Sequence, residues 1–73
     1  MSTLNREILN TLDGRQACSS EIAHYIGRKW ERVWEAIQIL KHSGLIALDV
    51  LRGRWELTAA GQAEIRPMLA VAA

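Results

Sequence analysis

Apolar residues recur every three or four positions near the start of the chain, a spacing that is typical of amphipathic helices. The stripe of Leu4, Ile8 and Leu12 predicts a first helix over about 4–12. Asp13-Gly14 follows the stripe directly and provides the residues that commonly end a helix. We expect this helix to belong to the scaffold of the domain.

Two further helices are predicted, with a tight turn between them. The first lies between the capping pair Ser19-Ser20 and Gly27, which favours a helix end. The second covers 29–43 and is stopped by Gly44. Its core positions recur at helical spacing and are Val33, Ile37 and Leu40. Two helices joined in this way are the layout of a helix-turn-helix.

The pattern changes after residue 44, where two strand-like runs replace the helical spacing. Leu45 to Val50 and Arg54 to Thr58 flank a short turn around Leu51-Arg52-Gly53, which predicts a β-hairpin. Successive strand residues point to opposite faces. One face of the first strand is therefore expected to cover the core, through Ile46, Leu48 and Val50.

A last helix is predicted from about Ala59, because Thr58 before it is a suitable N-cap. This helix would carry Ala63 and Ile65 back to the body of the domain. Pro67 has no backbone N–H to donate, and its ring disfavours an unbroken helix. We therefore expect a short C-terminal helix followed by a kinked or loose tail over 67–73.

These pieces, in this order and spacing, resemble the winged helix-turn-helix domains of bacterial transcription regulators of the MarR and PadR groups. The resemblance spans about residues 3–66. It rests on Glu21-Ile22-Ala23-x-x-Ile26-Gly27, Val33-x-x-x-Ile37-x-x-Leu40, Ser43-Gly44-Leu45-Ile46, Gly53-Arg54-Trp55 and Leu57-Thr58-x-x-Gly61. It implies an α+β, mostly α, fold with a three-helix core, a two-stranded β-hairpin wing and a short C-terminal helix. It also implies a very short strand within Arg15 to Cys18, beside the hairpin.

Length and composition are those of a single globular domain over 1–73. The chain has 73 residues, of which 49% are hydrophobic and 23% are charged, which excludes a disordered or low-complexity class. A domain of this size buries only about 60% of its extended-chain surface, so a homodimer would add stability. No apolar run approaches the roughly 20 residues that span a bilayer. Met1 to Asn5 lacks the features of a signal peptide, so we predict a cytoplasmic protein with no membrane partner.

Chemical motifs do not point to catalysis. The sequence has no phosphate-binding loop, no nucleophile motif and no paired acid and base. Cys18, His24 and His42 do not have the spacing of metal ligands. We therefore predict a protein that is not an enzyme and that uses no cofactor and no metal.

Basic residues are concentrated in two places, although the net charge is only +1. Five of the nine fall at the start of the 29–43 helix or at the hairpin turn, and the resemblance implies that these places lie on one side of the domain. A helix-turn-helix lays its second helix in the major groove of DNA, while nearby cations hold phosphates. The predicted contacts to double-stranded DNA are Arg28, Lys29, Trp30, Glu31, Arg32, Glu35, Gln38, Arg52 and Arg54.

The predicted recognition helix is more acidic than the family pattern. Helical geometry places Glu31, Glu35 and Gln38 on its outermost ridge, where the family commonly has small polar residues and Arg. A Glu side chain can accept a hydrogen bond from cytosine N4, so base readout is compatible with these residues. Alternatively, Arg28 with Glu31 and Arg32 with Glu35 form i, i+3 pairs on a solvated helix.

The tryptophans suggest a second function. Trp30 is expected at the edge of the core and Trp55 in it, whereas Trp34 is placed further out as a candidate for partner contact. The alternative to DNA binding is a winged-helix protein-protein interaction module that uses Trp34, Ile39 and the acidic Glu31 and Glu35. A continuous basic face would favour DNA, and an exposed Trp and Glu patch would favour a protein partner. A ligand-responsive regulator is a third alternative, which only the resemblance suggests.

Overall fold

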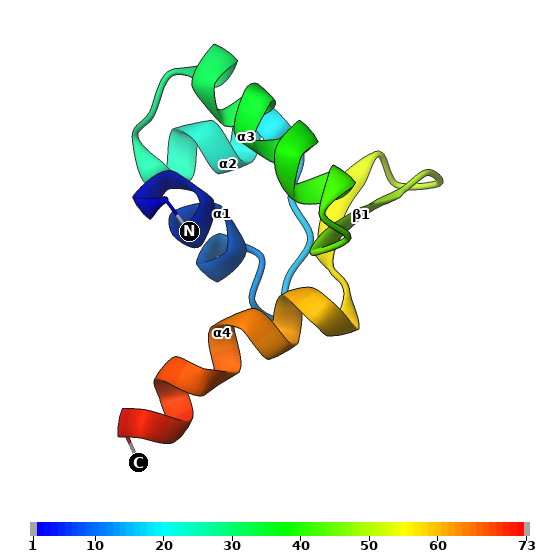
Figure 1. Cartoon of the computed structure of the whole chain (residues 1–73). Coiled ribbons are helices and arrows are strands. Elements are labelled where there is room, and N and C mark those ends of the chain that lie inside the picture. Colours follow the sequence, from blue (N-terminus) through cyan, green and yellow to red (C-terminus); the bar gives the residue numbers. More distant parts are fainter. Residues whose placement is uncertain (1, 73) are drawn as a thin grey trace.

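The elements of the structure follow the chain order that the apolar pattern predicted. The computed structural model describes residues 2–72, and the side chains of residues 2–66. Within this range the protein is α+β and mostly helical, with four helices and one two-stranded antiparallel hairpin, an arrangement that is compatible with a winged-helix layout. The elements are α1 (Thr3–Thr11), α2 (Ser19–Ile26), α3 (Trp30–His42), β1 (Ile46–Asp49), β2 (Arg54–Leu57) and α4 (Ala59–Ala72) (Figure 1).

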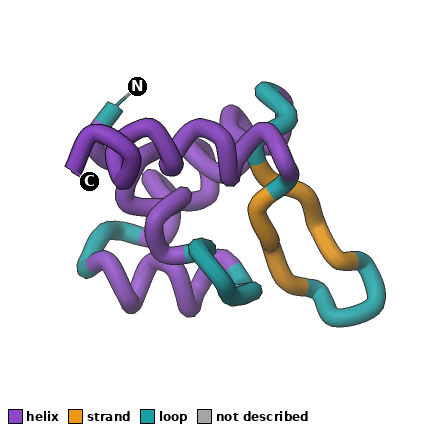
Figure 2. The backbone as a smooth tube through the Cα atoms, turned by 90° about the horizontal axis from the view of Figure 1, so that it is seen from below, coloured by secondary structure: helices purple, strands orange, loops and turns teal. Residues whose placement is uncertain are grey.

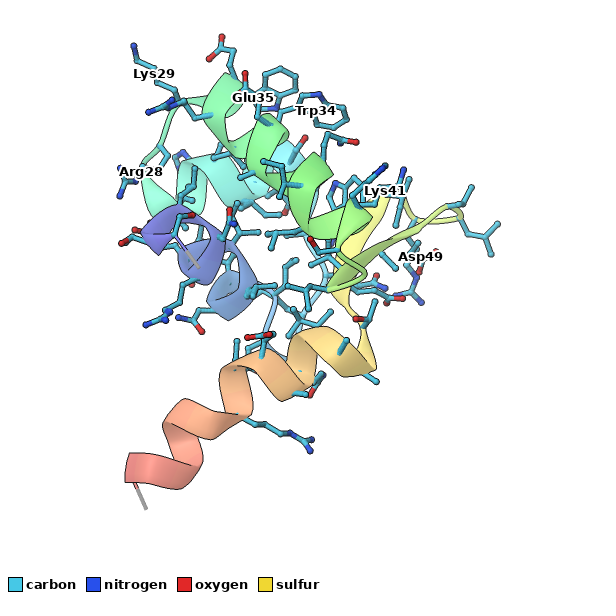
Figure 3. All side chains as sticks on the ribbon, in the orientation of Figure 1. Arg28, Lys29, Trp34, Glu35, Lys41 and Asp49 are labelled. Carbon is cyan, nitrogen blue, oxygen red and sulfur yellow. The ribbon has the colours of Figure 1, made fainter. Side chains whose placement is uncertain are left out.

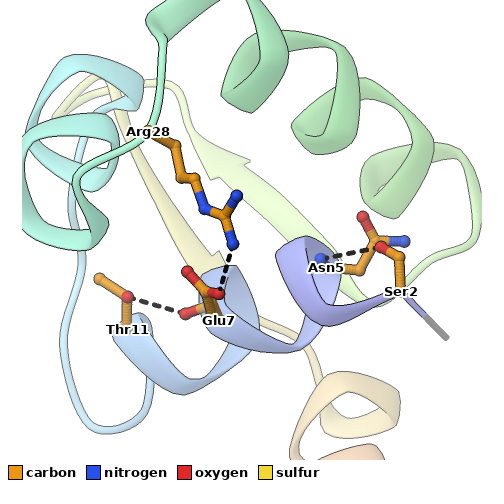
Figure 4. Close-up of polar contacts among 5 residues, drawn as sticks. All are labelled: Ser2, Asn5, Glu7, Thr11 and Arg28. Atoms are coloured by element: carbon orange, nitrogen blue, oxygen red, sulfur yellow. Dashed lines mark hydrogen bonds and ion pairs between the residues drawn. The ribbon is translucent and has the colours of Figure 1, made fainter.

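Side chains near the helix starts satisfy the first backbone N–H groups of α1 and α2. Ser2 caps α1, and its Oγ accepts a hydrogen bond from Asn5 N at 3.1 Å (Figure 4). The expected caps of α2, Ser19-Ser20, instead form its first two residues. Cys18 precedes α2, and its backbone N donates to Glu21 Oε1 at 3.1 Å. Backbone N–H groups at the start of a helix have no partner within the helix. Glu21 satisfies that of Cys18, and this contact is one half of a capping box.

Helices α1, α2 and α3 enclose the core, since each packs against the other two. Gly27 ends α2 with a φ of 68°, in the left-handed region, and Lys29 is the N-cap of α3. The fully buried side chains are Ile8, Leu9, Leu12, Ile22, Val33, Ile37, Leu40 and Ile46. The predicted core stripe of α3 is therefore confirmed, and that of α1 is confirmed at its second and third positions.

Strand β2 joins the hairpin to the rest of the domain. Strands β1 and β2 pair antiparallel, with Leu48 opposite Trp55. Ala17 pairs with Trp55 on the other edge of β2, through Ala17 N to Trp55 O at 3.1 Å and Trp55 N to Ala17 O at 2.8 Å. The very short strand implied beside the hairpin is thus a single bridge. Lys41 Nζ of α3 lies 6.0 Å from the centre of the buried Trp55 ring, at the outer limit of a cation–π contact.

The predicted core face of β1 is right only at its first residue. Ile46 is buried, but Leu48 is 41% exposed and Val50 is 81% exposed. Figure 2 shows the reason, because the hairpin extends beyond the helices and its far end has no element to pack against. Strand alternation assigns a side chain to a face, but it does not place a neighbour opposite that face.

Helix α4 is longer than predicted and does not end near Pro67. Thr58 caps it as expected, since its Oγ1 accepts a backbone N–H hydrogen bond of 3.1 Å from the first turn. Ile65 is buried, whereas Ala63 is exposed. The backbone stays helical to Ala72, so the expected kinked or loose tail is wrong, apart from residue 73, which lies outside the described residues. A proline inside a helix removes one backbone hydrogen bond and costs about 3 kcal/mol, and the helical backbone nevertheless continues on both sides of Pro67.

Candidate functional site

The outer face of α3 forms the centre of the candidate site. Lys29 caps the helix, and Glu31, Arg32 and Glu35 are exposed, as helical geometry predicted. Gln38, which was expected on the same outermost ridge, is half-buried. The helix therefore presents Lys29, Glu31 and Arg32 at its start, and Glu35 one turn further along its exposed face.

Trp30 and Trp34 form a stacked pair on one flank of this ridge. Their ring centres are 5.7 Å apart and their planes differ by 10°, within the range of offset aromatic stacking. Trp30 is 46% exposed and Trp34 is 40% exposed, so the expectation that Trp34 lies further out than Trp30 is wrong, whereas Trp55 is buried. Because side chains at i and i+4 meet on a helix surface, Trp30 packs on Trp34.

Arg32 and Ile39 lie on the other flank of α3. Together with Ser2 and Leu4 at the start of α1, they line a shallow hollow. Trp34 and Ile39 are five residues apart, which is about 140° around a helix axis. The two apolar anchors of the predicted partner face are therefore separated by the acidic ridge.

Neither i, i+3 pair of the solvated-helix alternative, Arg28–Glu31 or Arg32–Glu35, is among the ion pairs of the described residues, and Arg28 pairs elsewhere. Its Nη2 lies 3.1 Å from Glu7 Oε1 of α1, and Figure 4 shows the side chain reaching across to that helix. Glu7 also accepts a hydrogen bond through its backbone oxygen from Thr11 Oγ1 at 2.8 Å. Spacing rules within one helix did not reveal this contact, because the two partners are 21 residues apart.

The two hairpin arginines lie beside carboxylates. Arg52 Nε is 3.9 Å from Asp49 Oδ2, and Arg54 Nη2 is 3.9 Å from Glu21 Oε1. Exposed ion pairs of this kind contribute only about 0–1 kcal/mol, so both cations remain available to another anion. With Arg15, which the sequence analysis did not single out, Arg52 and Arg54 line a polar hollow of about 450 Å³.

The predicted basic residues form two groups instead of one continuous face. Figure 3 places Arg28 and Lys29 at the start of α3, and Asp49, the last residue before the hairpin turn, beyond the other end of the helix. Helix α3 has 13 residues, which corresponds to a length of about 20 Å. Trp34 and Glu35 lie between the two groups (Figure 3). The site thus has a basic end at α3, a basic hairpin, and an aromatic and acidic centre.

Two carboxylates near the hairpin stay ionised more readily than usual. The backbone hydrogen bond from Cys18, with further contributions from the Cys18 side chain and the Arg54 charge, lowers the pKa of Glu21. The hydrogen bond from the Gln16 side chain, at 3.1 Å, lowers the pKa of Asp49, and Arg52 adds to this effect. Both carboxylates are therefore negative at neutral pH and weaken the positive potential of the neighbouring arginines.

Besides Arg15, three surface residues were not predicted as part of the site. Val50 and Leu51 project from the hairpin turn, and Leu51 is 98% exposed. The signal in the sequence was two adjacent apolar residues directly before Arg52-Gly53, but the turn was interpreted only by its basic residues. Lys41 lies over the ring of Trp55 and thereby joins the end of α3 to the hairpin.

The described part of the chain contains no candidate metal-ligand cluster and no candidate membrane-spanning helix. Among the described residues, no group of three or more His, Cys, Asp or Glu side chains could hold a metal ion. His24 and His42 are exposed on α2 and α3, and Cys18 is half-buried at the start of α2. None of the helices within residues 2–72 combines the length and apolar character needed to cross a membrane.

Comparison with known proteins gives no family assignment. No family model, no curated protein and no solved structure matches this chain. The functional argument therefore rests on the residues and geometry of the chain itself.

Proposed function

We propose that this protein is a winged-helix domain that binds double-stranded DNA, with α3 as the recognition helix and the β1–β2 hairpin as the wing. The helix-turn-helix of α2 and α3, followed directly by a hairpin that pairs with Ala17, supports this proposal. The observation that carries it is this order of elements, because the basic residues form two groups, at the start of α3 and in the hairpin beyond its end, and not the continuous face that would favour DNA by charge alone.

Phosphates would be held by the two basic groups. The major groove is about 12 Å wide, so a helix lying in it has a phosphate backbone on either side. Lys29 and Arg32 would contact one backbone, and Arg52 and Arg54 the other. Arg28 joins the first group by exchanging Glu7 for a phosphate, which costs little because the ion pair is half exposed.

Base edges would be read by side chains spaced one turn apart along α3, beginning in its first turn. Glu31 and Glu35 can accept hydrogen bonds from cytosine N4, and Gln38 can pair with adenine in a bidentate manner. Since carboxylates repel phosphates, an acidic ridge binds well only where cytosines lie opposite it. Acidic residues would therefore reduce nonspecific binding more than binding to the preferred sequence.

Regulation of transcription in a bacterium, plasmid or phage is the biological role that we propose for such a domain. As a homodimer it would place two α3 helices in successive major grooves, about 34 Å apart. The DNA site would then consist of two inverted half-sites at that spacing.

Selection from random DNA tests the proposal. The purified chain would be mixed with a pool of random duplexes across a salt series, and the retained duplexes sequenced. An enriched motif with inverted repeats is the expected result. If no duplex is retained even at low salt, the proposal is wrong.

A protein partner is the second candidate, and the exposed Trp30–Trp34 stack favours it. Large aromatic side chains are enriched among the residues that dominate interface energetics. We propose the Trp34→Ala variant as the discriminating change, and Ile39→Ala, the second apolar residue of the predicted partner face, tests whether the opposite flank takes part. Loss of partner capture by Trp34→Ala with unchanged DNA retention would support this function, whereas loss of DNA retention would place Trp34 in the DNA interface.

A further inference from the structure

The turn of the hairpin carries the most exposed large apolar side chains in the described part of the chain. Leu51 is 98% exposed and Val50 is 81% exposed, more than any other large apolar residue with a described side chain. They lie next to each other at the end of an element that extends beyond the helices (Figure 2). This places a small apolar tip at the part of the wing that is furthest from the core.

The turn is held in shape by its own hydrogen bonds. Gly53 N donates to Asp49 O at 2.7 Å, and Arg52 N donates to Asp49 Oδ1 at 3.3 Å. The second carboxylate oxygen of Asp49 accepts a hydrogen bond from Gln16 Nε2 at 3.1 Å, which ties the turn to the loop before α2. Gly53 adopts a φ of 64°, a conformation that other residues rarely take. The tip is therefore presented by a braced turn.

The size of the tip restricts what it can bind. Two side chains offer far less area than the roughly 1,200 Å² that a stable protein interface buries in total. Membrane binding also scales with the buried apolar area, and a two-residue tip provides little of it. A base-pair step of DNA, in contrast, accepts a wedge of one or two apolar side chains such as Leu.

The charge beside the tip fits the same partner. The Arg52 side chain is 73% exposed and follows the two apolar residues directly, and Arg54 is 49% exposed at the start of β2. A narrow minor groove has an enhanced negative potential that attracts Arg. Asp49 precedes the two apolar residues, and its Oδ2 lies 3.9 Å from Arg52 Nε, but this ion pair is exposed and leaves the Arg52 side chain available to a phosphate. An apolar wedge followed by two arginines thus matches a groove lined by phosphates with a stacked step at its floor.

We propose that the wing enters the minor groove and that Leu51, supported by Val50, inserts between adjacent base pairs and kinks the duplex. This inference rests on the proposed DNA binding and specifies how the hairpin contacts the duplex. Arg52 contacts the phosphates that line the groove, while Leu51 separates the two stacked base pairs. Steps that unstack easily, such as TA, would be preferred at that position, so the wing contributes to sequence preference without hydrogen bonds to bases.

A fluorescent duplex tests the wedge directly. The probe is a duplex of about 30 base pairs with a central TA step, 2-aminopurine in place of the adenine at that step, and a donor and an acceptor dye at its ends. Unstacking raises the 2-aminopurine fluorescence, and bending raises the energy transfer. The wild-type chain should raise both signals, with a bend of roughly 20–90°.

Two variants separate the wedge from the phosphate contact. Leu51→Ala should abolish the 2-aminopurine signal and the bend, and weaken binding by roughly tenfold. Arg52→Ala should keep both signals and make binding less dependent on salt. Both residues are largely exposed, so thermal melts should confirm that the variants are folded. Val50→Ala is a second wedge variant, with a smaller loss expected.

The possible outcomes distinguish a failure of the Leu51 wedge from a failure of the proposed DNA binding. Binding by the wild type without unstacking, or equal signals for Leu51→Ala and the wild type, would overturn the wedge and leave DNA binding standing. No binding of the probe or of random duplexes at low salt would overturn both.

Discussion

Helix α3 packs on the core along its whole length, whereas the hairpin that follows it packs on the core only at its base. Along α3, the residues Val33, Ile37 and Leu40 are buried over the whole length of the helix. In the hairpin, Ile46 and Trp55 are buried at the base, and exposure rises from Leu48 to the tip. Stability is therefore concentrated under α3, whereas the far end of the hairpin is free to contact a partner.

The largest effect should come from the core under α3. Leu40→Ala should cost about 2–5 kcal/mol, because it leaves a cavity beneath a side chain that is 1% exposed. Small domains have only about 5–15 kcal/mol in total, so the thermal midpoint should fall steeply. A thermal melt checks this, and a midpoint close to that of the wild type would contradict the core assignment.

A second large effect is expected where α4 meets the connection between α3 and β1. A Cβ added at Gly61 would lie 2.0 Å from the backbone oxygen of Leu45. Gly61→Ala should therefore destabilise by about 1–3 kcal/mol, as other overpacking changes do. Ala has the higher helix propensity, so without the close approach the same change should stabilise by about 1 kcal/mol. Denaturant unfolding gives the sign, and a stabilised variant would show that α4 packs less closely.

The same Leu→Ala change at the hairpin sharpens the comparison. Leu51→Ala should alter stability by less than about 0.5 kcal/mol, as is usual for exposed positions. Leu48→Ala should fall between it and Leu40→Ala, because Leu48 is 41% exposed and lies opposite Trp55. Denaturant unfolding of all three variants should give the order Leu40, Leu48, Leu51. A cost at Leu51 equal to that at Leu40 would mean that the tip is buried in solution.

The smallest effect concerns the acid stability of the hairpin turn. Hydrogen bonding from Gln16 makes the pKa of Asp49 lower in the folded chain than its ordinary value of 3.8. The unfolded chain therefore binds more protons in this range, and the contribution of Asp49 is present above pH 3.8 and lost as the pH falls through the folded pKa. Asp49→Asn should flatten this part of the stability profile. Parallel acid profiles for variant and wild type would show that the ionised side chain does not support the turn.

The sequence predicted α3 well because one periodicity decides its structure. A spacing of three to four residues identifies the buried face, and a helix of 13 residues offers several repeats of it. The exposed Glu31 and Glu35 then follow from geometry alone. The relative exposure of Trp30 and Trp34 was harder to predict, because an angle around the helix axis does not determine how much of a side chain its neighbours cover.

The hairpin and the ion pairs were harder to predict because their partners are distant in sequence. The alternation of side chains along a strand placed Val50 on the core face, but the core ends before the chain reaches Val50, which is therefore exposed. Likewise, Arg28 meets Glu7 and Arg54 approaches Glu21, interactions that arise only when separate helices and strands are assembled. Spacing rules describe neighbours within one element, so they could not reveal these pairs.

The most direct test of the proposed DNA binding is a salt titration of duplex binding by the wild type and by an Arg52→Ala, Arg54→Ala double variant. Each phosphate that a cation neutralises contributes about 0.9 to the slope of log affinity against log salt concentration. The account predicts that the double variant binds all sequences more weakly and has a slope that is shallower by about 0.9 for each phosphate that is no longer neutralised. Identical slopes and affinities would contradict a wing that binds DNA.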